Sequence, residues 1–89
     1  MAMMATRDEE LIAQHIDANP QGRGPAEARL AEYGTPVWAL IAYLDAVKGD
    51  RAAVAADYEV PEEAVAAAIA FYERHKPQID ARLLVNAAA

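Results

Sequence analysis

The chain has 89 residues, a length that favours one domain with one modest hydrophobic core. Because 55% of the residues are hydrophobic and 25% are charged, the composition is typical of an ordered globular protein and excludes a disordered one. The absence of cysteine excludes disulfides and thiolate metal sites, and the net charge of −6 argues against a broad nucleic-acid-binding surface.

The first predicted helix is Asp8–Ala18, in which apolar side chains recur at helical spacing. Thr6 or Asp8 can cap its first turn, and Pro20 follows its end. Residues 21–25 are rich in turn formers and are expected to form a flexible connector.

The segment Pro25–Tyr33 admits two structures, and its pattern slightly favours a short helix. Pro25 suits the first turn of a helix, and Gly34 suits the stop after its last turn. The alternative is a short β-hairpin in which Ala28–Leu30 pairs with Thr35–Val37.

Later helices are each bounded by a glycine or a proline at one end. They are Pro36–Lys48, Arg51–Asp57, Pro61–His75 and Pro77–Ala87. The helix Pro61–His75 has apolar edges on two sides, so we expect it to lie at the centre of the fold. The predicted fold class is therefore all-α, a small helical bundle, with the short N-terminal β-hairpin as the alternative for one segment.

Nothing in the sequence indicates an enzyme. The chain contains no serine and no cysteine nucleophile, and no glycine-rich phosphate loop. Of its two histidines, His15 lies beside an apolar stripe and is expected to pack, whereas His75 ends a helix and is expected to cap it. No spacing of histidines and carboxylates matches a metal site. We therefore predict no catalytic residue, cofactor, metal ion or small-molecule substrate.

The sequence also lacks the signals of a membrane or secreted protein. Its longest apolar run, Pro36–Leu44, is far shorter than the ~20 residues that span a bilayer. Met1–Arg7 has no charged region followed by an apolar stretch, as a secretion signal would have. We expect a cytoplasmic protein without membrane contact.

Residues Asp50–His75 form a candidate helix-turn-helix, because a short helix, a tight turn and a longer helix follow one another. The second helix would enter the major groove with Glu62 and Glu63 near its start, where phosphates would repel both carboxylates. Direct DNA binding is thus only weakly indicated, with Lys48 and Arg51 as its candidate contacts.

The second half of the chain resembles a bacterial family known as domain of unknown function 433, many of whose members are predicted antitoxins. The resemblance covers roughly Ala28–Ala88 and leaves 1–27 as an N-terminal helix and connector within the single domain 1–89. The resemblance rests on the segments Thr35–Trp38, Val54–Tyr58, Val60–Val65, Ala67–His75 and Ile79–Leu83, and on Asn86. The first half departs from the family, since the usual glycine-rich pair of strands is reduced to Ala28–Leu30.

This resemblance implies a homeodomain-like helical core, a homodimer and a toxin partner of the PIN-like ribonuclease type. The implied toxin-contacting residues are Tyr72, His75, Ile79, Arg82, Leu83 and Asn86. The residues expected in the core or the dimer contact are Trp38, Leu40, Ile41, Leu44, Val65, Ile69 and Phe71.

The leading hypothesis is an antitoxin-like protein-binding module that pairs with such a toxin and takes part in regulating its own operon. A net charge of −6 suits a cationic partner, and an apolar C-terminal helix suits docking into a groove. The alternatives are a stand-alone helix-turn-helix DNA-binding regulator and a structural dimerisation module with no activity of its own.

Overall fold

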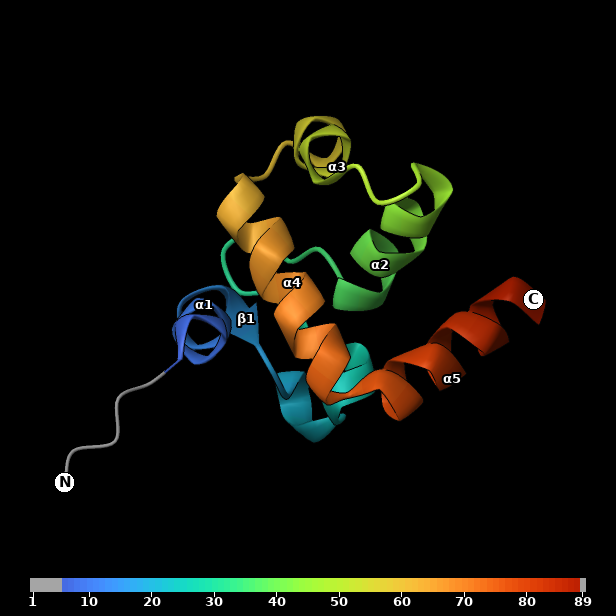
Figure 1. Cartoon of the computed structure of the whole chain (residues 1–89). Coiled ribbons are helices and arrows are strands. Elements are labelled where there is room, and N and C mark those ends of the chain that lie inside the picture. The colour runs from blue at the N-terminus through green and yellow to red at the C-terminus, as the bar shows by residue number, and fades with distance from the viewer. Residues whose placement is uncertain (1–5, 89) are drawn as a thin grey trace, which may run out of the picture.

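Helix α4 (Glu62–Arg74) is the centre of the fold, and helices α1, α2, α3 and α5 pack around it (Figure 1). The computed structural model describes residues 6–88, which are mostly helical with one small antiparallel sheet. The elements around α4 are α1 (Arg7–His15), β1 (Ile16–Asp17), the 3₁₀ turns η1 (Pro20–Gly22) and η2 (Pro25–Glu27), β2 (Arg29–Leu30), α2 (Val37–Ala46), α3 (Arg51–Tyr58) and α5 (Lys76–Ala88). The predicted central position of the 61–75 helix is confirmed.

Two sequence predictions concern a secretion signal and a membrane-spanning helix. The prediction that there is no secretion signal rests on Met1–Arg7, of which 1–5 lie outside the described residues. Across residues 6–88, no helix has the length and apolar character needed to cross a bilayer.

Local interactions set where the helices begin. The Thr6 hydroxyl accepts a hydrogen bond from the Glu9 N–H at 3.1 Å, and the Asp50 carboxylate accepts one from the Ala53 N–H at 3.1 Å. Helix α5 begins at Lys76 and carries Pro77 in its first turn, where a missing N–H leaves no bond unmade. The predicted ends of α2 to α5 agree with the structure within two residues.

We expect Asp50→Ala to lower the free energy of unfolding by about 1 kcal/mol, because the N–H groups at the start of α3 lose their side-chain acceptor. Urea denaturation followed by circular dichroism measures this change. Glu32→Ala removes an exposed carboxylate from a turn and is the matched control. An equal loss in both variants would contradict the capping role.

Helix α1 ends three residues before its predicted end, because the next two residues form strand β1 of the sheet. Ile16 pairs with Leu30 and Asp17 pairs with Arg29 in antiparallel register. The Ala31 N–H also donates to the His15 carbonyl at 2.8 Å. These contacts come from outside the predicted helix, so its local pattern did not reveal them.

The slight preference for a helix over Pro25–Tyr33 is wrong, and the hairpin alternative is correct in part: Arg29 forms an antiparallel bridge with Pro36, but the strand that pairs with Arg29–Leu30 in the sheet is Ile16–Asp17. The Leu30 N–H donates to the Thr35 carbonyl at 2.8 Å, and the Val37 N–H donates to the Ala28 carbonyl at 2.9 Å. The chain reverses through Gly34, whose φ of 72° is readily adopted by glycine. Only Pro25–Glu27 is helical, as a single 3₁₀ turn. Burial alternates here with the period of a strand, because Ala28 and Leu30 are buried and Arg29 is exposed.

The hydrophobic core surrounds the alanine-rich faces of α4. Ala64, Ala67 and Ala68 are fully buried, and such small side chains allow neighbouring helices to approach α4 closely. Among the described residues, no polar or charged side chain is buried. The larger buried side chains are Leu11, Ile16, Leu30, Val37, Leu40, Ile41, Val54, Val60, Val65, Phe71 and Ile79.

Candidate partner-binding face

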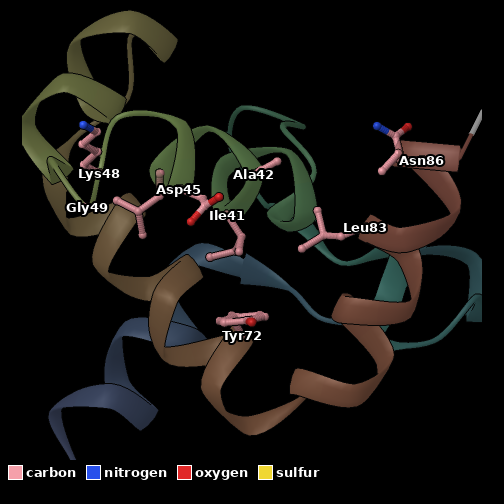
Figure 2. Close-up of a pocket in the computed structure, with 10 residues that line it drawn as sticks. Ile41, Ala42, Asp45, Lys48, Gly49, Tyr72, Leu83 and Asn86 are labelled. Carbon is pink, nitrogen blue, oxygen red and sulfur yellow. The ribbon is translucent and has the colours of Figure 1, made fainter.

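A groove of about 560 Å³ lies between α2 and α5 (Figure 2). Tyr72 of α4 lies at its base, while Ile41 of α2 and Leu83 of α5 contribute apolar walls. Lys48, in the turn after α2, lies at the opposite end of the groove from Asn86 of α5. The complete lining is Ile41, Ala42, Leu44, Asp45, Lys48, Gly49, Tyr72, Leu83, Asn86 and Ala87.

The last turns of α5 expose large apolar side chains to solvent. Leu84 is 73% exposed and Val85 is 65% exposed, whereas Ile79, on the first turns of the same helix, is fully buried. Figure 1 shows this end of α5 extending away from the other helices. Because Leu83 faces the groove, the end of α5 carries apolar side chains both on its groove side and on its exposed side.

Tyr72 joins α4 to α5 at the base of the groove. Its hydroxyl donates a hydrogen bond to the Asp80 carboxylate at 2.7 Å, and the Lys76 ammonium lies 5.8 Å from the centre of its ring. The hydrogen bond to Asp80, followed by burial and the negative charges of Asp80 and Asp45, raises the pKa of Tyr72 to about 12. The phenol is therefore neutral and remains a donor at physiological pH.

This shift predicts a stability change at alkaline pH. Because the folded pKa of Tyr72 lies above the ordinary 10.0, its contribution to stability is complete below pH 10.0 and is lost as pH rises towards about 12. Subtracting the tyrosinate absorbance titration of Tyr72→Phe from that of the unmodified protein should leave a midpoint near 12. If the midpoint of this difference titration lies at the ordinary tyrosine pKa of 10.0, the hydrogen bond to Asp80 is contradicted.

Arg82 fixes α5 to two earlier parts of the chain. Its Nε lies 3.1 Å from a carboxylate oxygen of Glu27 in η2, and its guanidinium lies 4.5 Å from the ring centre of Trp38 in α2. Both members of the ion pair are only 30% exposed, so solvent screens it less than a surface pair. Arg82 thus holds the wall of the groove in place instead of pointing towards a partner.

The predicted toxin-contacting residues fall into two groups. Tyr72, Leu83 and Asn86 come together along the groove. Ile79 lies in the core, Arg82 is engaged by Glu27, and His75 ends α4 with its ring centre 4.4 Å from that of Phe71. Leu84 and Val85 were absent from the prediction, although three consecutive apolar residues cannot all lie on one face of a helix.

Most of the residues predicted for the core or a dimer contact are inside the protein. Four of them, Leu40, Ile41, Val65 and Phe71, belong to the buried core. The remaining three, Trp38, Leu44 and Ile69, are partly buried and pack against it. The buried members therefore stabilise the fold of the monomer.

His15 has the packing position that its sequence context predicts. Its side chain is 15% exposed at the contact between α1 and α4, with Nε2 lying 3.6 Å from the Glu63 carboxylate. Arg7 forms an ion pair with the same carboxylate at 3.1 Å. This cluster ties α1 across the start of α4.

The candidate helix-turn-helix corresponds to α3 and α4, joined through Glu59 in a left-handed conformation with φ of 55°. Lys48 and Arg51, the weakly indicated DNA contacts, are exposed near the start of α3. Helix α4 is covered by α1 on one side and by α2 and α3 elsewhere, and Glu62 and Glu63 are exposed at its start. This arrangement leaves little of α4 free to enter a DNA groove.

Comparison of the chain with protein-family models, with characterised proteins and with solved structures returns no match.

Proposed function

We propose that this protein is an antitoxin-like module that binds a basic partner protein along the α2–α5 groove and the exposed end of α5. The observation that carries the proposal is the exposure of Leu84 and Val85 on a helix that also forms one wall of an apolar groove. Exposed apolar side chains grouped beside a concave surface are typical of protein-binding sites. The resemblance to predicted antitoxins supports the same class of function.

The shape of the face favours a macromolecule over a small ligand. Sites for small molecules usually enclose most of the ligand and offer several convergent polar groups. Among the described residues that line the groove, the charged ones are Asp45 and Lys48. The end of α5 extends beyond the groove. A partner segment can contact both the groove and the exposed side of α5, which a small molecule cannot.

The charge of the chain favours a basic partner over a second copy of itself. Each copy carries a net charge of −6, so association of two copies brings like charges together. A basic protein gains from the opposite potential, which raises its association rate and disfavours other partners. A PIN-like ribonuclease toxin, the partner that the family resemblance implies, is the specific partner that we propose.

DNA binding has weaker support as an alternative function. The helix that would read bases is the central helix α4, and its exposed first residues include two carboxylates, Glu62 and Glu63. Phosphate contacts supply much of the affinity of DNA-binding proteins, and this surface opposes them.

The test is co-expression with the product of the neighbouring gene, followed by affinity capture of the complex and a growth assay. The proposal expects a stable one-to-one or higher complex and relief of the toxicity of the partner. Sedimentation of the chain alone provides a second measurement. Failure to form the complex, or a tight homodimer that buries Leu84 and Val85, would overturn the proposal.

A further inference from the structure

A second hollow, of about 390 Å³, lies between α2 and α3. Its lining consists of Trp38, Ala39, Ala42, Tyr43, Ala46 and Tyr58. Ala42 also lines the α2–α5 groove, so the two concave surfaces meet along α2. A protein that covers the groove can therefore reach this aromatic hollow without leaving the same face.

The walls of the aromatic hollow are ring surfaces. The rings of Tyr43 and Tyr58 pack edge to face, with centres 5.4 Å apart and planes inclined at 60°. Trp38 adds an indole, and the short side chains of the alanines leave room beside these rings. None of the described residues that line the hollow is charged.

A carboxylate is held next to these rings. The Tyr43 hydroxyl donates a hydrogen bond to Asp57, which is exposed on α3. This bond is the main cause that raises the pKa of Tyr43 above 10.0, so the phenol remains a donor near neutral pH. An ionised carboxylate accepts several hydrogen bonds, and Asp57 therefore retains capacity for a further donor.

At Arg82 the protein contains an arginine that contacts both an aromatic ring and a carboxylate. There a guanidinium lies over the Trp38 ring and pairs with the Glu27 carboxylate. Tyr43, Tyr58 and Asp57 supply the aromatic surface and the carboxylate, but within residues 6–88 no Lys or Arg lies over either tyrosine or pairs with Asp57. A guanidinium gains from both components, because it stacks on rings and donates to carboxylates.

We infer that the aromatic hollow binds an arginine side chain of the partner, which stacks on the exposed surface of the tyrosine rings and pairs with the Asp57 carboxylate. This inference rests on the proposed function for the identity of the partner, because a basic protein presents such side chains. The recognition itself depends only on the hollow, so it can be measured without the partner.

The experiment titrates the protein with the capped peptide acetyl-Gly-Arg-Gly-amide and with its citrulline analogue, which keeps the shape and lacks the charge. Ring resonances of Tyr43 and Tyr58 report binding by nuclear magnetic resonance. Fluorescence of Trp38, the single tryptophan of the chain, reports it independently. We expect saturable changes with the arginine peptide at millimolar concentration and none with citrulline.

Asp57→Asn is the deciding variant, because asparagine can still accept the bond from Tyr43 but carries no charge. We expect it to weaken binding of the arginine peptide about threefold to fivefold, the upper part of the range of an exposed charge pair. Glu32→Gln makes the same change in net charge at an exposed turn and should leave the affinity unchanged. Equal responses to both peptides, or equal affinities for Asp57→Asn and the unmodified protein, would overturn the inference.

The two proposals fail separately. If the partner is captured but the arginine peptide leaves the aromatic hollow unchanged, the inference is wrong and the proposed function stands. If the peptide binds the hollow and no partner complex forms, the proposed function is wrong and the recognition of arginine stands.

Discussion

Replacing Leu84 and Val85 together with glutamine is expected to abolish capture of the partner while leaving the fold intact. Both side chains are mostly exposed, so little burial within the chain is lost, and glutamine is a good helix former. If the partner covers them fully, burial of a leucine or valine side chain contributes about 2 kcal/mol. Each substitution should therefore weaken binding by about 30-fold.

Isothermal titration with the purified partner measures this loss, and urea denaturation checks that stability is unchanged. Tyr33→Gln is the matched control, since Tyr33 is the other large hydrophobic residue in residues 6–88 that is exposed, at 43%, and it lies in a turn and not in α5. Unchanged affinity in the double variant would show that the end of α5 is not part of the interface.

Ile79→Ala is expected to cause the largest loss of stability, about 2–5 kcal/mol, because it leaves a cavity where α5 meets the core. The Ile79 side chain is fully buried, and it lies on the helix that carries Leu83 into the groove. Small domains unfold with a total of about 5–15 kcal/mol, so this change is a large fraction of the whole.

Urea denaturation gives the total effect, and hydrogen exchange of the α5 amides shows whether the helix detaches before the rest unfolds. Ile79→Val removes a single methyl group and should cost about 0.5–1.5 kcal/mol. Equal stability of the alanine variant and the unmodified protein would mean that α5 is not anchored through this residue.

The helices were predictable because their boundaries depend on neighbours in the sequence. Asp50 caps α3 and Pro77 opens α5, and each signal can be recognised without knowledge of the fold. The pairing of Ile16 with Leu30 was not predictable in this way. Two-residue strands are too short to show an alternating pattern, and their partner lies outside any local window.

The groove was predictable in part for a related reason. Leu83 and Asn86 are three positions apart, so the helical period alone puts them on one side of α5. The inward position of Arg82 depends on Glu27, which is 55 residues away in the sequence. The aromatic hollow likewise requires α2 and α3 to be side by side before Tyr43 can meet Asp57.

The ion pair between Arg82 and Glu27 joins two parts of the chain that are far apart in the sequence, because Glu27 belongs to the segment between β1 and β2. That segment is thus a brace for the C-terminal helix. Cleavage in the connector 21–25 would loosen this brace and, with it, one wall of the groove. Conversely, a partner that clamps α5 would slow proteolysis of the connector, so a cut site near the beginning of the chain can report occupancy at its opposite end.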